Sequence, residues 1–334
     1  MKNKILSLTL FMVFSFGVFA QETIKIGIIG LDTSHSKAFT QLLNGGEAKE
    51  YSEFKIVAAY PYGSRTIESS YKRIPGYIED VKKFGVEITN SIQELLDKVD
   101  CVMLETNDGT IHLEQAIEVF KSGKIMFIDK PIAADLADAI AIFKLAEKYD
   151  VPVFSSSALR YTPQTQKLRN GDFGKIMGAD CYSPHRIEPS HPDFGWYGIH
   201  GVEMLFTVMG TGCKYVSRMS TDSVVDVVTG RWENGNIGTF RGMQTGNSIY
   251  GGTAFTEQGA QPVGPYSGYL DLLKEILKFF KTREAPVSPA ETLEIFTFME
   301  ASNISKAKGG KIISMEDTYK KAEKKADKIL KKYK

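Results

Sequence analysis

The sequence predicts an α/β protein, in which a Rossmann-like, doubly wound parallel sheet is followed by an α+β domain with an open-faced, mainly antiparallel sheet. Short apolar segments alternate with helical segments over residues 24–153, which is typical of parallel strands joined by crossover helices. The segment 125–128 is apolar throughout and lies between Gly123 and Pro131, as expected for a strand buried on both faces. After Ser155 this alternation stops, which indicates a second domain.

The first domain should alternate strands with helices. We expect strands at residues 24–29, 55–60, 101–105, 125–128 and 151–155, and helices at residues 36–43, 92–96, 113–121 and 136–149. The connection at 61–86 is long for such a unit and is rich in proline and glycine. We therefore expect it to fold over the end of the sheet.

The second domain should combine strands with amphipathic helices. We expect a strand at 175–185, a helix at 199–209, a hairpin over 224–242 that turns at Glu233-Asn234-Gly235, and helices at 269–280 and 289–308. The lysine-rich segment 320–334 has apolar residues at helical spacing. We interpret it as an amphipathic helix that packs on the body of the protein.

Residues 1–20 have the pattern of a secretory signal peptide. Lys2 and Lys4 precede an apolar run at 8–14, and Val18-Phe19-Ala20 is a suitable cleavage site. The run is short for a membrane span, so we expect an exported protein, periplasmic in a Gram-negative source or secreted. The remaining chain divides into a nucleotide-binding domain at 21–155, a substrate and oligomerisation domain at 156–316, and a C-terminal amphipathic helix at 317–334.

Composition excludes several classes of function. The 41 basic and 40 acidic residues nearly balance, so no strong field attracts nucleic acid. Of the three cysteines, Cys101 lies in an expected buried strand, which leaves Cys181 and Cys213 as the one pair for a disulfide. His185, His191, Glu188 and Asp193 do not have the spacing of a closed metal site, and we expect no metal.

The end of the 125–128 strand is where chemistry is expected, because doubly wound sheets bind ligands beyond the carboxyl ends of their strands. Here that end carries Asp129 and Lys130, and Pro131 then stops the strand. Taken alone, this tripeptide also fits a lysine that reaches water beside an aspartate partner.

Four short motifs along the chain strengthen the functional reading. They are Asp129-Lys130-Pro131 after a helix that begins near Asn107 and His112, Leu159-Arg160-Tyr161-Thr162-Pro163, the turn at 170–176, and the helix start at 198–203. Together they resemble the Glu-Lys-Pro, Arg-aromatic-x-Pro, Gly-x-x-Gly-x-Ile and Gly-x-His-x-x-Asp motifs of the Gfo/Idh/MocA oxidoreductases, the family of glucose-fructose oxidoreductase and inositol dehydrogenase. Their order and spacing agree over residues 24–315.

The resemblance implies NAD or NADP at the turn after the first strand, but this turn departs from the usual Gly-x-Gly-x-x-Gly. The chain has Gly30-Leu31-Asp32-Thr33-Ser34-His35, so only Gly30 matches. An aspartate about 4 Å from a phosphate charge would cost roughly 4 kcal/mol at an effective dielectric of 20. Alternatively, Asp32 or Ser34 caps the next helix and the cofactor is displaced outward, or held by Thr33, Ser34, Ser36 and Arg65.

We therefore expect NAD or NADP that is tightly bound or lost, and weak binding of free dinucleotide. The expected cofactor contacts are Gly30, Asp32, Thr33, Ser34, Asn107, His112, Asp129 and Lys130.

The resemblance further places the substrate between the domains, where Lys130 and His200 reach it. Glu203 lies three residues after His200 on one helix face and is expected to orient this general acid/base. His200 also fits a plain interface histidine bonded to that carboxylate. Further candidates for substrate binding are Arg160, Tyr161, Trp196 and Tyr197. Trp196 stands where the family usually has an acid, and its ring suits stacking on a sugar.

Two classes of function follow from these residues. The first is an NAD(P)-dependent oxidoreductase acting on a sugar, cyclitol or glycoside outside the cytoplasm. The second is a glycoside-cleaving or isomerising enzyme with a tightly held or absent dinucleotide, or a non-catalytic carbohydrate-binding protein, which export of an unfolded, cofactor-free chain favours. In either class we expect a small-molecule carbohydrate partner, a homo-oligomer formed through the C-terminal sheet, no nucleic acid and no membrane span.

Overall fold

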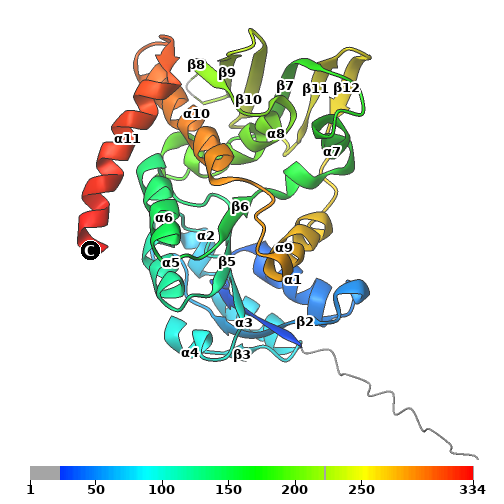
Figure 1. The fold of residues 1–334 in the computed structure, drawn as a ribbon, viewed down its shortest axis with the longest axis vertical. Coiled ribbons are helices and arrows are strands. Elements are labelled where there is room, and N and C mark those ends of the chain that lie inside the picture. Colours follow the sequence, from blue (N-terminus) through cyan, green and yellow to red (C-terminus); the bar gives the residue numbers. More distant parts are fainter. Residues whose placement is uncertain (1–22, 222, 334) are drawn as a thin grey trace, which may run out of the picture.

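The computed structural model describes residues 23–221 and 223–333. The expected signal peptide lies outside these residues. Within them the chain forms two sheets with helices packed around each, and the first sheet occupies the lower half of Figure 1 and the second the upper half. The predicted fold class is confirmed, because the first sheet is parallel and the second is mainly antiparallel.

The first sheet has the strand order β3-β2-β1-β4-β5-β6. Its strands are β1 (Ile24–Ile29), β2 (Phe54–Tyr60), β3 (Glu87–Ile88), β4 (Cys101–Leu104), β5 (Ile125–Asp129) and β6 (Val153–Ser156). Every residue of β5 is buried, since it pairs with β4 on one side and β6 on the other. The order reverses between β1 and β4, and the carboxyl ends of these strands open the crevice where such sheets bind ligands.

Helices cover both faces of this sheet. One face carries α4 (Ile92–Leu96), α5 (His112–Lys121) and α6 (Leu136–Lys148), and the other carries α1 (Ser34–Asn44). α9 (Leu270–Thr282) follows the second sheet in sequence but returns to pack beside α1, as Figure 1 shows. Its Ile276 and Phe279 share a buried cluster with Phe39 of α1 and Phe127 of β5. The first core is therefore completed by a segment from the second half of the chain.

The connection at 61–86 folds over the carboxyl end of the sheet, as expected. It forms α2 (Glu68–Tyr71) and α3 (Ile74–Lys82), and α3 packs against α1. Its first residues close on the turn after β1, where the Leu31 amide donates to the Pro61 carbonyl at 3.0 Å. This connection therefore forms one wall of the ligand crevice.

The second sheet has the order β12-β11-β7-β10-β9-β8-β13, and only β7 and β10 pair in parallel. Its strands are β7 (Ile176–Pro184), β8 (Cys213–Thr221), β9 (Val225–Trp232), β10 (Ile237–Met243), β11 (Gly251–Thr256), β12 (Gly259–Val263) and β13 (Ile313–Ser314). The predicted hairpin is β9–β10. β8 and the β11–β12 hairpin were not predicted. β8 lacks a strong apolar alternation, and β11 and β12 are short segments that begin with glycine.

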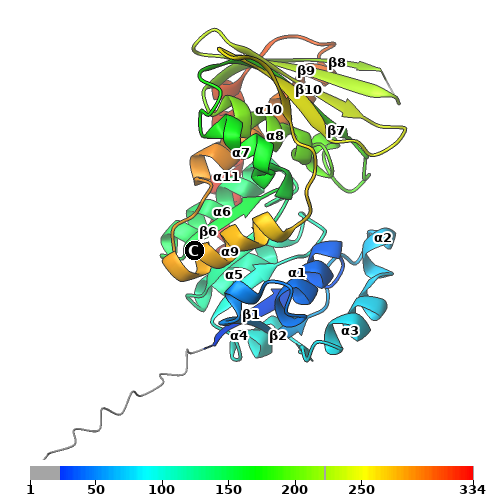
Figure 2. The ribbon, with the colours of Figure 1, turned by 90° about the vertical axis from the view of Figure 1, so that its right-hand side faces the viewer.

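One face of the second sheet is covered by helices. α8 (Ile199–Met209) packs on β7 and β10, and α10 (Pro289–Ala307) packs on β8, so both lie on the same side in Figure 2. The short helix α7 (Pro163–Arg169) packs against α8. Among the described residues no helix covers the opposite face, where Tyr215, Met219, Ile237 and Phe255 are exposed.

The C-terminal helix, α11 (Met315–Leu330), begins earlier than the expected segment and packs along α6. Ala322 and Ala326 are buried, and Lys144 of α6 pairs with Asp327 at 2.9 Å. The helix therefore turns a buried apolar side toward the body of the protein. No helix in the described part of the chain is long and apolar enough to cross a membrane.

The disulfide considered between Cys181 and Cys213 does not form, since both thiols are free and buried. Cys181 lies in β7 and Cys213 in β8, and strands β10 and β9 separate them. Three strand spacings correspond to about 14 Å, whereas a disulfide needs Cα atoms within about 7 Å.

Candidate active site

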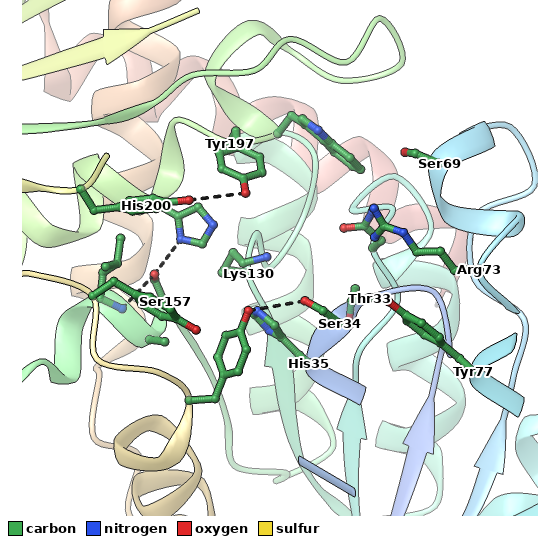
Figure 3. Close-up of a pocket in the computed structure, with 17 residues that line it drawn as sticks. Thr33, Ser34, His35, Ser69, Arg73, Tyr77, Lys130, Ser157, Tyr197 and His200 are labelled. Carbon is green, nitrogen blue, oxygen red and sulfur yellow. Dashed lines mark hydrogen bonds between the residues drawn. The ribbon is translucent and has the colours of Figure 1, made fainter. Parts of the chain in front are cut away.

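A cleft of about 440 Å³ opens between the carboxyl end of the first sheet and the second domain. The turn after β1, the α2–α3 connection and Lys130 line it from the first domain. The 3-10 turn η2 (Ala158–Tyr161), the 196–200 segment and three tyrosines of the second half line it from the other side. Figure 3 shows these side chains converging on one space.

Lys130 lies at the floor of the cleft, immediately after β5. Its Nζ is 3.5 Å from Asp129 Oδ2, while Asp129 Oδ1 is 3.0 Å from His35 Nδ1. Burial opposes charge on both groups, but their mutual attraction raises the pKa of Lys130 and, together with His35, lowers that of Asp129. At neutral pH Lys130 is therefore a fixed cation facing the cleft.

His200 lies across the cleft from Lys130 (Figure 3). Its Nδ1 is 2.8 Å from the Ser157 hydroxyl. Burial and the nearby charge of Lys130 hold the pKa of His200 well below its ordinary value. The ring is therefore neutral at pH 7 and able to accept a proton.

Glu203 does not orient His200 directly, which corrects the prediction from their spacing. Its carboxylate faces the domain interior, where it accepts hydrogen bonds from the Ser156 hydroxyl (2.5 Å), the Ser157 amide (2.9 Å) and Arg160 Nε (2.8 Å). The effect on His200 is indirect, because the carboxylate fixes Ser157 and Ser157 contacts the histidine.

Arg160 and Tyr161 do not line the cleft. This corrects the prediction that they contact the substrate directly. Arg160 is buried between Glu203 and Glu291, with an Nη1 to Oε1 distance of 2.7 Å to the latter. Tyr161 is buried in the core on the α9 side of the first sheet. The motif that contains them is therefore a structural joint between β6, α8 and α10.

Aromatic side chains form the rim of the cleft. Trp196 and Tyr197, both expected from the sequence, line it together with Tyr250, Tyr266 and Tyr269. Such rings supply flat apolar faces beside hydroxyl groups, which suits a ligand with a ring of C–H and O–H groups.

The loop that carries Trp196 is fixed at two points. Asp193, in η3 (Asp193–Gly195), binds His185 at 2.7 Å and Arg218 at 3.0 Å. The Gly109 amide donates to His191 Nε2 at 3.2 Å, which ties the loop to the first domain. His185 and His191 thus belong to separate hydrogen-bond networks.

The turn after β1 differs from both sequence alternatives for Asp32. Its carboxylate does not line the cleft or cap α1; it accepts the amides of Ser64 (2.9 Å) and Asn107 (3.0 Å). Burial raises the pKa of Asp32 to about 6. The two amides lower this pKa and the nearby Asp108 raises it further, so burial outweighs the hydrogen bonds. Gly63 lies so close that a Cβ there would be 2.2 Å from Asp32 Oδ2. Asp32 therefore locks two loops together.

The start of α1 fits an anionic group such as the pyrophosphate of a dinucleotide. Thr33 and Ser34 line the cleft at this end, and no side chain caps the helix. Thr33 Oγ1 is buried without a hydrogen-bond partner among the described residues. Arg73 of the α2–α3 connection lines the same space. Free helix amides, an unsatisfied hydroxyl and a guanidinium together suit a phosphate.

Four of the expected cofactor residues line the cleft, namely Thr33, Ser34, Asn107 and Lys130. The other four are buried beneath it. A Cβ on Gly30, which has φ +93°, would be 2.5 Å from the Thr106 amide, and both ring nitrogens of His112 bond backbone carbonyls. Asp32 and Asp129 bond other side chains and loops as described above. Gly30, Asp32, His112 and Asp129 were predicted to contact the cofactor directly. In the structure they instead support the residues that line the cleft.

Sequence reasoning missed several residues of the cleft. His35 was treated only as a replaced glycine, and Arg73 and Ser157 were not singled out. Their partners lie far away in sequence, such as Asp129 at 94 positions from His35 and His200 at 43 positions from Ser157. No local pattern encodes such contacts.

The cleft therefore lies between a doubly wound first domain and an open-sheet second domain, at the end of the parallel sheet where such folds bind ligands. The oxidoreductase family Gfo/Idh/MocA, described as having an NAD-binding Rossmann fold, matches residues 24–157. Over these residues the chain is similar to that family, which confirms the resemblance predicted from the sequence.

Solved structures share the fold over nearly the whole chain. An oxidoreductase from Thermotoga maritima is 19% identical with a TM-score of 0.67, covering 89% of this chain and 100% of that chain. A myo-inositol dehydrogenase from Lactobacillus casei, in complex with NAD(H) and myo-inositol, is 13% identical with a TM-score of 0.68, covering 87% and 96%. A scyllo-inositol dehydrogenase from the same organism is 15% identical with a TM-score of 0.70, covering 89% and 99%. No curated protein matches the chain.

Proposed function

We propose that this chain is an NAD(P)-linked oxidoreductase that acts on a hydroxyl group of a small carbohydrate or cyclitol. The observation that carries the proposal is a charged Lys130 and a neutral His200 sharing one cleft with the uncapped start of α1. The inositol dehydrogenases of similar fold support the substrate class.

In the oxidation of an alcohol, each of the main side chains of the cleft has a separate role. Neutral His200 takes the hydroxyl proton, and the Lys130 ammonium donates a hydrogen bond to the oxygen and stabilises the negative charge that develops there. Ser157 holds the imidazole in place through its bond to Nδ1. The rings of Trp196 and Tyr197 pack against the substrate and exclude water.

A nicotinamide, when bound, supplies the hydride acceptor. The residues that would hold the dinucleotide are Thr33 and Ser34 at the amino end of α1, with Arg73 beside them. Asn107, whose amide bonds Asp32 and whose side chain bonds Ser70 at 2.8 Å, keeps this part of the cleft open.

Two measurements test this function. Native mass spectrometry of the purified protein shows whether a dinucleotide is retained. A panel of cyclitols and sugars, assayed with NAD and with NADP, should then show reduced nicotinamide, and Lys130→Met should abolish it without a large change in melting temperature. Retained dinucleotide, or turnover with one cofactor, supports the proposal. No bound dinucleotide and no binding of added NAD or NADP would contradict it.

We also propose that the protein acts outside the cytoplasm and forms an oligomer. The sequence of residues 1–20 supports export. The exposed Tyr215, Met219, Ile237 and Phe255 on the outer face of the second sheet support self-association there. Cell fractionation with sequencing of the mature amino terminus tests the first. Light scattering of the wild type and Ile237→Asp tests the second, and a monomeric wild type would contradict it.

A further inference from the structure

His35 is an ionisable residue of the cleft that the proposed oxidation does not use. It stands in a turn position where dinucleotide-binding folds usually carry glycine. In this structure its ring lines the cleft and is only 6% exposed. It packs against Tyr269, with ring centroids 4.4 Å apart, and against Phe39 at 5.9 Å. The ring is therefore held in one orientation.

The partner of His35 determines which ring nitrogen carries the proton. Nδ1 lies 3.0 Å from Asp129 Oδ1, and Asp129 is fully buried. Asp129 is also paired with the Lys130 ammonium, so it is ionised and can only accept hydrogen bonds. Nδ1 must then be the donor, so in the neutral imidazole it is Nε2 that carries the free lone pair.

Nε2 of His35 is open to the cleft. It makes no hydrogen bond to any residue that the structure describes. Unlike Thr33 Oγ1 from the same turn, which is fully enclosed and has no hydrogen-bond partner, His35 Nε2 is not fully enclosed. Since His35 lines the cleft, the free nitrogen faces the space where a ligand would bind.

We propose that His35, oriented by Asp129, is a second proton-accepting residue of this cleft. A histidine whose Nδ1 is held by a buried carboxylate presents a basic Nε2, and this arrangement serves general acid/base catalysis on unrelated folds. The proposal rests on the proposed function only in placing a substrate between His35 and His200. It gives the cleft a base on each wall, with the Lys130 cation between them.

Glu105 is the group that competes with this interpretation. It is fully buried, both of its oxygens lack partners among the described residues, and Oε2 is 4.0 Å from His35 Nδ1. Burial raises the pKa of Glu105 well above its usual range, which leaves Asp129 as the charged partner of His35. His35, Glu105 and Asp129 also have ligand atoms within 4.8 Å of one another, so a bound divalent cation is the alternative occupant.

Histidine modification by diethyl pyrocarbonate, mapped by mass spectrometry, tests the inference without a substrate or a cofactor. The reagent attacks an accessible, unprotonated ring nitrogen. His35 and His200 should be modified, whereas His112 and His185, whose ring nitrogens are both hydrogen-bonded, should be protected. In Asp129→Asn the new amide can donate to Nδ1 and move the proton to Nε2, so modification of His35 should fall at least about tenfold.

Glu105→Gln is the matched control, because it removes the neighbouring carboxyl without touching the Asp129 contact. Modification of His35 should stay within about twofold of the wild type. A wild-type His35 as unreactive as His112 would overturn the proposal. Stoichiometric zinc or manganese in the purified protein, lost in Glu105→Gln, would overturn it in favour of a cation site.

The catalytic part of the inference needs a substrate. His35→Gln should lower kcat by about a hundredfold or more with little change in KM. Equal kcat for His35→Gln and wild type would limit His35 to a structural role. Failure to find a dinucleotide would refute the proposed oxidation but leave the modification result standing.

Discussion

His200 acquires its proposed role from its surroundings. Burial and the charge of Lys130 keep the imidazole neutral, so it is a proton acceptor over a wide pH range. We expect wild-type activity to persist below about pH 6.5, the ordinary pKa of histidine. His200→Asn should lower kcat by roughly 10² to 10⁴ and remove the acidic limb of the pH–rate profile. Steady-state kinetics across pH measures both. An unchanged profile in His200→Asn would leave His200 a structural residue.

Asp32 shows how one residue can mislead a motif-based argument. From sequence its charge opposes a phosphate, and its replacement should improve dinucleotide binding. In the structure the carboxylate accepts two backbone amides from separate loops and does not reach the cleft. We expect Asp32→Ala to lose about 1–3 kcal/mol of stability for each unsatisfied amide. Chemical denaturation and calorimetric titration of NAD measure the two effects, and a tenfold tighter NAD complex would restore the original interpretation.

Elements differ in how far the sequence predicts them. β4 and β5 are buried on both faces, so they appear as continuous apolar segments between turn residues and were placed almost correctly. β8 alternates weakly, and β11 begins with two glycines, so neither was found. In the cleft, Lys130 was predictable because a strand end positions it. His35 was not, because its role depends on Asp129, which lies 94 residues away.

The α2–α3 connection contributes Arg73, a cleft residue that lies outside every motif identified from the sequence. Arg73 lines the cleft beside the start of α1, and its Nη1 donates a hydrogen bond to the Asp32 carbonyl at 3.4 Å. We expect Arg73→Gln to weaken NAD or NADP binding about tenfold, which corresponds to loss of a charge-assisted hydrogen bond, and to leave the melting temperature nearly unchanged. Lys72→Gln, at the exposed residue that follows α2, is the control. Equal affinities of the two variants would place the phosphates elsewhere.

At the scale of the whole molecule, the cleft exists only because contacts between the two domains fix their relative positions. α9 completes the first core, and Arg160 joins β6 to α8 and α10 through Glu203 and Glu291. The loop that carries Trp196 is fastened to the second sheet by a buried ion network of His185, Asp193, Asp226 and Arg218. Stability of this network therefore controls the shape of the substrate side.

The network makes the stability of the second domain depend on pH. Burial alone would lower the pKa of His185, but its bonds to Asp193 and Asp226 raise it above the unfolded value of about 6.5. A group with a raised folded-state pKa contributes stability that is fully present below the unfolded pKa and is lost as pH rises through the folded pKa. The difference in unfolding free energy between wild type and His185→Gln should therefore be larger at pH 6 than at pH 9, roughly 2 kcal/mol at the acidic end. Urea denaturation of both proteins at the two pH values measures it. A difference that does not change with pH would mean that His185 is neutral between its two carboxylates, and that Arg218 and Lys306 alone balance their charge.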